Sequence, residues 1–241
     1  MRVVGVVPAR FGSQRFPGKP LAKILGKPMI QWVLEGARES KKLDALYLAT
    51  DHEEIAKVAR HMGIRVVFTA SDLPSGTDRV YHALSPQPPD VVINIQGDEP
   101  MIRGKHIDAL VEVFEEDARV QVATLAYKSP DPEGPDRVKI VTDLQGFALY
   151  FSRSPIPYYR FEDTQRIYWI HVGVYGYRWP ALETWVQHPP TPLERAEGLE
   201  QLRALQLQMK IKVVSIPDPC FPVDRPEDLE KVAALLQRQT S

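Results

Sequence analysis

The first 120 residues alternate short apolar runs with segments whose apolar residues recur every three or four positions. The runs predict strands at residues 3–7, 46–49, 65–68 and 91–95. The periodic segments predict helices from Pro28, over residues 53–61 with Asp51 as the cap, and over about 104–115. Strands separated by helices cross over and pair in parallel. We therefore expect a Rossmann-like, doubly wound α/β fold with a mostly parallel sheet.

Beyond about residue 120 the pattern changes to short apolar runs separated by turn residues. Runs at residues 122–127, 138–141 and 148–151 predict antiparallel strands, and residues 166–179 predict a strand or hairpin. Further predicted elements are one helix over residues 193–208, a strand over 211–216 and a closing helix from Pro226. We expect a mixed sheet in one domain, residues 1–241, with a small antiparallel, β-rich lobe at about 120–180.

Composition limits the compartments and partners that we consider. The 30 basic and 31 acidic side chains leave a formal charge of -1, so no global field draws the protein to nucleic acid or an anionic membrane. The single cysteine, Cys220, excludes a disulfide framework and a zinc site built from several thiolates. No stretch resembles a signal-peptide core or the roughly 20 apolar residues of a membrane span. We expect a cytoplasmic protein.

The loop after the first strand, PARFGSQRFPGKPL, concentrates positive charge. It contains three cations, two glycines and a serine: Arg10, Arg15, Lys19, Gly12, Gly18 and Ser13. Glycines let backbone N–H groups approach phosphate oxygens, and Arg and Lys donate to them. Because open α/β sheets bind ligands at the carboxyl ends of their strands, the loop predicts a polyphosphate site. It matches neither GxGxxG nor GxxxxGK(S/T), which disfavours a dinucleotide dehydrogenase and a P-loop ATPase.

Carboxylates follow the apolar run VVINI. Asp98 and Glu99 in QGDEP stand at a strand end, where a carboxylate can hold magnesium against bound phosphates, although a plain acidic turn is an alternative. Asp224 in VDRPEDLE is either a second metal ligand or the cap before Pro226, and the spacing does not decide between them. The turn SGTDR, residues 75–79, either contacts a ligand or caps the helix that follows.

Other reactive or aromatic residues give weaker evidence for a functional site. His171 lies inside an apolar strand, where a histidine is more often a core residue than a catalytic one. The chain lacks GxSxG, and Cys220 has prolines nearby rather than a base. Without an accompanying basic stripe, core or dimer-interface roles are favoured over base stacking for the aromatic residues Tyr158, Tyr159, Trp169, Tyr175 and Tyr177.

Taken together, these segments resemble the bacterial CMP-KDO synthetases, the 3-deoxy-manno-octulosonate cytidylyltransferases. The matching pieces run in the family's order from end to end: PARFGSQRFPGKPL, GKPMIQWVLE, ATDHEEI, SGTDR, VINIQGDEP, FSRSPIP, HVGVYGY, PLERAEGLEQLR and VDRPEDLE. The first loop is shared with cytidylyltransferases for sialic acids, whereas QGDEP, HVGVYGY and LEQLR are particular to the KDO enzymes. The chain departs from the family at Arg225, usually Thr, and at Asp136, often Asn.

The resemblance implies a nucleotide-diphospho-sugar transferase fold and transfer of CMP from CTP to KDO, with magnesium as cofactor, in lipopolysaccharide precursor synthesis. It implies nucleotide binding by Pro8, Ala9, Arg10, Ser13, Arg15, Lys19, Ser75, Gly76 and Asp98. It implies catalytic roles for Arg10, Lys19 and Asp98, and magnesium ligands at Asp98 and Asp224. It implies sugar binding by Arg79, Gln96, Arg153, His171, Tyr175, Glu200 and Gln201. A homodimer is also implied.

In this interpretation the anomeric hydroxyl of KDO attacks the α-phosphorus of CTP in line, and pyrophosphate leaves. One alternative is the same chemistry on another acid sugar, such as a sialic acid or an 8-amino KDO analogue. A second is a non-catalytic nucleotide-binding or regulatory protein that keeps the fold. Lys19, Asp98 and Asp224 argue against the second, because a binding protein needs no metal-bridging carboxylates at the phosphates.

Overall fold

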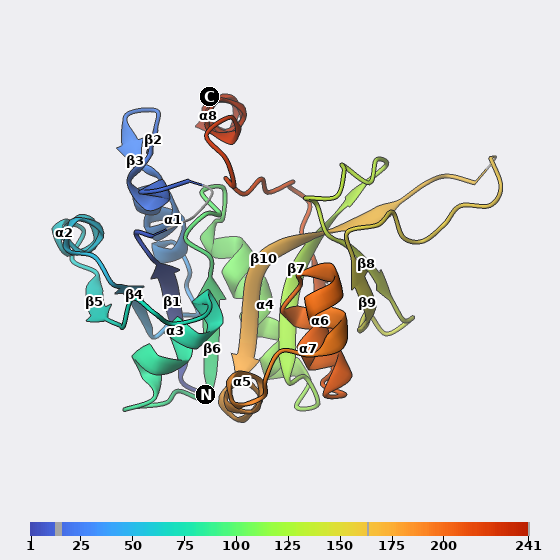
Figure 1. Cartoon of the computed structure of the whole chain (residues 1–241), viewed down its shortest axis with the longest axis horizontal. Coiled ribbons are helices and arrows are strands. Elements are labelled where there is room, and N and C mark those ends of the chain that lie inside the picture. Colours follow the sequence, from blue (N-terminus) through green and yellow to red (C-terminus); the bar gives the residue numbers. More distant parts are fainter. Residues whose placement is uncertain (13–15, 163, 241) are drawn as a thin grey trace.

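The computed structural model describes residues 1–12, 16–162 and 164–240. Its centre is a mixed sheet with the strand order β11-β7-β10-β6-β1-β4-β5, to which β8 and β9 add at β10 (Figure 1). The strands are β1 (Val3–Ala9), β4 (Ala45–Thr50), β5 (Arg65–Phe68), β6 (Val91–Ile95), β7 (Val122–Ser129), β8 (Lys139–Thr142), β9 (Ala148–Ser152), β10 (Tyr168–Arg178) and β11 (Ile211–Ser215). β1 pairs in parallel with β4 and β6, whereas β10 runs antiparallel to β6, β7 and β8.

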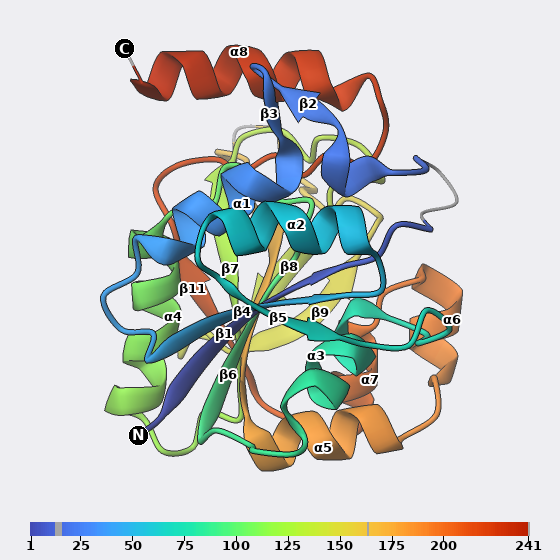
Figure 2. The same cartoon turned by 90° about the vertical axis from the view of Figure 1, so that its left-hand side faces the viewer.

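Helices cover both faces of this sheet (Figure 2). The helices of the described residues are η1 (Lys19–Leu21), α1 (Met29–Arg38), α2 (Glu53–His61), α3 (Gly76–Leu84), α4 (Gly104–Glu116), α5 (Trp179–Gln187), α6 (Pro192–Glu197), α7 (Gln201–Gln206) and α8 (Asp228–Thr240), of which α8 lies away from the sheet. A small hairpin, β2 (Lys23–Ile24) and β3 (Lys27–Pro28), precedes α1. No helix in the described ranges is long and apolar enough to cross a membrane.

The side chains of β1 point alternately to the two faces of the sheet, and each face is covered by its own hydrophobic core. Val3 and Val7 join one core, with residues of α1, α2 and α4. Val4 and Val6 point to the other face and join a second core, with residues of α3, α5 and α7. Because both faces are buried, the strand reads as a continuous apolar run rather than an alternating one. This confirms the predicted α/β fold with a mostly parallel sheet and a small antiparallel part.

The cap of α2 is His52, so the prediction of Asp51 was wrong. The Nδ1 atom of His52 accepts a hydrogen bond from the Glu54 N–H at 3.2 Å. Asp51 faces the carboxyl edge of the sheet instead. One of its oxygens accepts from the Phe11 N–H at 3.1 Å, and the other lies 3.6 Å from Nη2 of Arg79. Asp is among the residues most favoured as a helix cap, but the tertiary partners of Asp51 hold its carboxylate away from α2.

The predicted helix over residues 193–208 is two short helices, α6 and α7. Gly198 ends α6 in the left-handed region with φ of 62°, a conformation that glycine adopts without the steric cost of a Cβ. Residues 166–179 resolve into one long strand, β10, with a register shift between Val172 and Tyr175. The last helix begins at Asp228, two residues after the predicted start, and the Asp228 carboxylate accepts from the Asp224 and Arg225 N–H groups, each at 2.8 Å.

Candidate active site

Two adjoining cavities lie beside the carboxyl ends of β1 and β6. The larger has a volume of about 480 Å³, within the range of small-molecule sites, and the smaller about 230 Å³. Among the described residues, Gly76, Gln96 and Glu200 line both cavities. The cavities therefore meet at the N-terminus of α3, the end of β6 and the start of α7.

The larger cavity collects most of the residues predicted to bind nucleotide. They come from the end of β1, η1, the start of α3 and the end of β6: Pro8, Ala9, Arg10, Lys19, Ser75, Gly76 and Asp98. Asp224, predicted as a magnesium ligand, lines the same cavity from the segment before α8. Ser13 and Arg15 lie outside the described residues. Gly97 lets the ends of β1 and β6 approach closely, because a Cβ there would lie 2.8 Å from the Pro8 carbonyl oxygen.

The Lys19 ammonium lies between two carboxylates of this cavity. Its Nζ donates to Asp98 Oδ2 at 2.6 Å and to the Val223 carbonyl at 2.9 Å, and lies 3.8 Å from Asp224 Oδ1. The Val223 N–H in turn donates to the Asp98 carbonyl at 2.9 Å. These contacts bring the segment before α8 across the end of β6, and those from Lys19 to Val223 and Asp224 join residues more than 200 positions apart in the sequence.

The donor set at this point suits magnesium that is shared with phosphates. Asp98 and Asp224 remain 27% and 35% exposed, and a cation, the Lys19 ammonium, already lies against both. Within the described ranges no group of three His, Cys, Asp or Glu residues could hold a metal. Magnesium often takes one or two carboxylates, substrate phosphates and water, which is what two carboxylates beside a polyphosphate loop can offer.

Glu99, the other acid of QGDEP, is buried away from the cavity. Its Oε1 accepts from the Gly173 N–H at 2.9 Å. Burial, together with the neighbouring charge of Asp98, raises the pKa of Glu99 to about 8. Glu99 therefore helps to fix the end of β6 against β10, and Asp98 is the acid of the pair that faces the larger cavity.

Arg79 lies in the larger cavity, next to nucleotide-binding candidates rather than in the smaller one. Its side chain is 2% exposed, and Nη1 donates to the Thr69 hydroxyl. Nη2 has no hydrogen-bond partner among the described residues and lies 3.6 Å from Asp51. A buried guanidinium with a free donor is suited to an acceptor on a bound ligand. The sequence reasoning missed Asp51 as the group that orients it.

The smaller cavity contains the remaining sugar-binding candidates except Arg153. It is lined by residues from β6, β10 and α7 that include Gln96, His171, Tyr175, Glu200 and Gln201. The Nε2 atom of His171 lies 3.0 Å from the Thr124 hydroxyl, and burial lowers the pKa of His171 to about 3. His171 is thus a neutral hydrogen-bonding group. Gln201 is buried, and its Nε2 has no partner within the part of the chain that the structure describes.

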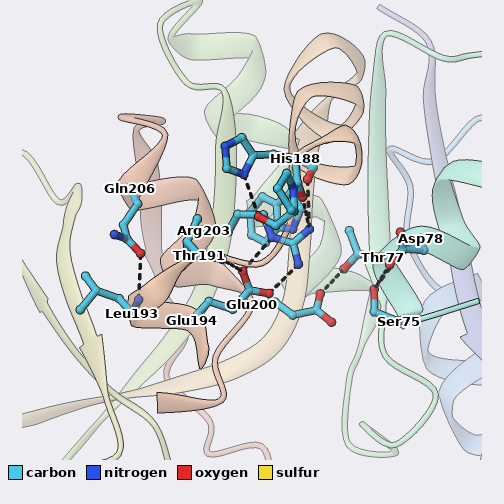
Figure 3. A network of polar contacts seen from close by, with 12 residues as sticks. Ser75, Thr77, Asp78, His188, Thr191, Leu193, Glu194, Glu200, Arg203 and Gln206 are labelled. Carbon is cyan, nitrogen blue, oxygen red and sulfur yellow. Dashed lines mark hydrogen bonds and ion pairs between the residues drawn. The ribbon is translucent and has the colours of Figure 1, made fainter. Parts of the chain in front are cut away.

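Glu200 connects the two sides of this site (Figure 3). Its carboxylate accepts from the Thr77 hydroxyl of α3 at 3.0 Å, and burial raises its pKa. Behind it, Arg203 forms an ion pair with Glu194 that holds α6 and α7 together. Thr77 was not singled out from the sequence, although it lies within the SGTDR turn.

Arg153 does not appear among the described residues that line the two cavities. Its guanidinium donates to three backbone carbonyls, those of Glu197 at 2.7 Å, Pro135 at 3.2 Å and Gly198 at 3.3 Å. Its sugar-binding role stays a prediction. In this structure it connects the strand end of β9 to the turn between α6 and α7.

Comparison with known proteins identifies the family. The cytidylyltransferase family profile matches residues 4–211. The 3-deoxy-manno-octulosonate cytidylyltransferase of Bdellovibrio bacteriovorus is 46% identical, with 99% of both chains covered, and that of Geobacter sulfurreducens is 41% identical over 98% of this chain and all of the relative. The chain belongs to the 3-deoxy-manno-octulosonate cytidylyltransferases. This confirms the family indicated by the motifs.

A solved structure of a cytidylyltransferase of this kind, CMP:2-keto-3-deoxy-manno-octonic acid synthetase complexed with CTP, has the same architecture. It superposes with a TM-score of 0.93 and 40% identity, covering 99% of this chain and all of the other. A cytidylyltransferase from Leptospira borgpetersenii, at 18% identity and a TM-score of 0.66, shares the fold alone.

Proposed function

We propose that the chain transfers CMP from CTP to KDO and releases pyrophosphate, with its product used for lipopolysaccharide synthesis. The observation on which this rests is the junction of the two cavities at Gly76, Gln96 and Glu200. The larger, lined by Arg10, Lys19 and Asp98, would take CTP, and the smaller would take the acid sugar. When two reactants are held side by side, their reaction becomes effectively unimolecular. This lowering of the entropic barrier accounts for a large part of the rate enhancement of group transfer.

In this proposal the protein contributes position and charge. The anomeric oxygen of KDO forms a bond to the α-phosphorus and its hydroxyl proton passes to solvent water, while the bond from that phosphorus to the pyrophosphate oxygen breaks. The Lys19 ammonium and the Arg10 guanidinium stabilise the negative charge that accumulates on the pyrophosphate. Neutral His171 and the free amide of Gln201 orient sugar hydroxyls without adding charge.

Asp98 and Asp224 would hold magnesium in the loaded enzyme. When bound, the ion would neutralise the phosphate oxygens of CTP. Lys19, which lies against both carboxylates in the free chain, would then exchange part of that contact for phosphate oxygens. Both carboxylates are partly exposed, so this exchange needs no unfolding of the site.

Pyrophosphate release tests the proposed reaction. We expect release from CTP and magnesium when KDO is supplied, and none with sialic acid in place of KDO, with UTP in place of CTP, or with EDTA. Pyrophosphate release with sialic acid and not with KDO would support the proposed mechanism but contradict KDO as the substrate. If no pyrophosphate is released with any acid sugar, the result would favour a protein that binds the nucleotide without transferring CMP.

We also propose a homodimer that works in the cytoplasm. The single cysteine, which is buried, supports a reducing compartment. The lobe around β8 and β9 and the long connection to β10 expose large apolar side chains: Leu144, Leu149, Tyr158, Phe161 and Ile167. Such side chains are typical of an interface between subunits. Sedimentation at micromolar concentration should give twice the 27.3 kDa chain mass, and a 27.3 kDa species would contradict the proposal.

A further inference from the structure

Lys139, at the start of β8, is a buried cation that the proposed reaction does not use. Its side chain is fully buried, and its ammonium donates to the backbone carbonyls of Gly134 at 2.8 Å, Arg137 at 2.6 Å and Arg153 at 2.6 Å. An ammonium has three donors, so each is used. Burying a charge is costly unless its hydrogen bonds are made. The three carbonyls therefore gather around Lys139, and the two loops that carry them are held together.

The first of these loops forms one wall of the smaller cavity. Val138 lines the cavity and lies between Arg137, whose carbonyl binds Lys139, and Lys139 itself. The Val138 carbonyl accepts from the His171 N–H at 2.8 Å. Lys139 thus fixes the backbone on both sides of a cavity residue, next to the strand that presents His171.

The second connection runs through Arg153 to the turn between α6 and α7. The Arg153 carbonyl binds Lys139, and its side chain donates to the Glu197 and Gly198 carbonyls. The Glu197 carboxylate accepts from the Arg153 N–H at 3.0 Å and from the Ser152 hydroxyl at 2.6 Å. The turn that follows continues into Glu200 and Gln201, which line the cavity. Two walls of the smaller cavity are therefore attached to one buried ammonium.

We infer that Lys139 is a positioning residue for the sugar site, which holds Val138 on one wall and, through Arg153 and Glu197, the turn of residues 198–201 on the other. The inference rests on the proposed function, in which the smaller cavity takes KDO. Apart from Glu200, which lines both cavities, the described residues of the larger cavity come from β1, η1, the start of α3, the end of β6 and the segment before α8, which Lys139 does not contact through these bonds. Loss of the ammonium should therefore affect the sugar and spare the nucleotide.

The test compares Lys139→Met with a matched control, Arg178→Met. Met keeps much of the length and apolar volume of the lysine stem but makes none of the three hydrogen bonds. We expect the KM for KDO to rise about tenfold and the KM for CTP to change by less than about twofold. Amide hydrogen exchange should become faster in residues 134–138 and 197–201 and stay unchanged in β1 and β6.

Arg178 is a fitting control because it also binds backbone carbonyls, those of Val120 and Phe114, each at 2.9 Å, and lines neither cavity within the described residues. Its replacement should lower stability without separating the two KM values. Equal KM ratios in the two variants would overturn the inference while leaving the proposed function in place.

A second variant tests the inference if the Lys139→Met protein does not fold. Glu197→Ala removes the partly exposed carboxylate in the same path, and we expect about a threefold rise in the KM for KDO with the KM for CTP unchanged. An unchanged KM for KDO in this variant would overturn the inference. If the wild-type enzyme proves inactive with KDO and active with sialic acid, the proposed function fails, and the KM for that acid decides the inference by the same comparison.

Discussion

Replacing Lys19 by Met is expected to lower kcat by about 10²- to 10³-fold with the fold intact. Lys19 is the cation that lies against both Asp98 and Asp224, at 2.6 and 3.8 Å, so it stands where phosphate charge would develop. Met fills similar volume and cannot carry that charge. The fold should persist, because the two carboxylates that lose their partner remain partly exposed to water.

Initial rates of pyrophosphate release at saturating CTP and KDO measure this effect, with circular dichroism as the check of folding. Lys23→Met is the matched control, since Lys23 is an exposed lysine only four positions away in β2. Its turnover should remain within about twofold of the wild type. Near-normal turnover of the Lys19 variant would rule out its role at the leaving group.

Replacing Arg203 by Met is expected to cost about 3–5 kcal/mol of stability, a large part of the total for a domain of this size. The buried guanidinium forms an ion pair with Glu194 through Nε at 2.8 Å and Nη2 at 2.5 Å (Figure 3). Nη1 also donates to the carbonyls of Trp185 and His188, each at 3.1 Å. The Met variant would leave the Glu194 carboxylate buried without its counter-charge.

Urea unfolding followed by tryptophan fluorescence measures this loss, since Trp185 lies within the network. The double variant Glu194→Gln with Arg203→Met is the control. A neutral amide can still accept from the Thr191 N–H, as Glu194 does at 3.0 Å, but buries no charge. We expect the double variant to regain part of the lost stability. A double variant less stable than Arg203→Met would show that the unpaired charge is not the main cost.

Local sequence signals were sufficient to predict where in the fold the site lies. The apolar run of β1, the following cationic loop and the acid after β6 predicted where the larger cavity would lie, because a parallel sheet brings the carboxyl ends of its strands to one edge. Lys19 and the acidic pair Asp98 and Glu99 came from residue type and position, and the family resemblance then selected Asp98. The smaller cavity and its residues were implied by the family resemblance, and the structure brings His171, Tyr175, Glu200 and Gln201 together there.

Contacts between distant segments could not be predicted from those local signals. Apolar periodicity over residues 193–208 continues through Gly198, yet the left-handed backbone at that glycine ends α6 and turns Glu200 toward α3. Arg225 and Asp136, the two departures from the family pattern, lie within 4.0 Å of each other across 89 residues. Neither position predicts the other, because the pairing depends on how the segment before α8 crosses the loop before β8.

Residue type and spacing thus determined most of the strand and helix order and the chemistry of the polyphosphate loop, since these depend on local backbone preference and on which faces are apolar. Helix α5 and the β2–β3 hairpin were not predicted, and the family was indicated by the resemblance of the motifs taken together. Tertiary structure alone decided that Asp51 orients Arg79 rather than capping α2, that Glu99 is buried while Asp98 faces the cavity, and that Lys139 gathers three carbonyls. Each of these depends on which distant polar groups are buried together. Burial makes an unpaired polar group costly, and so selects partners that no short stretch of sequence specifies.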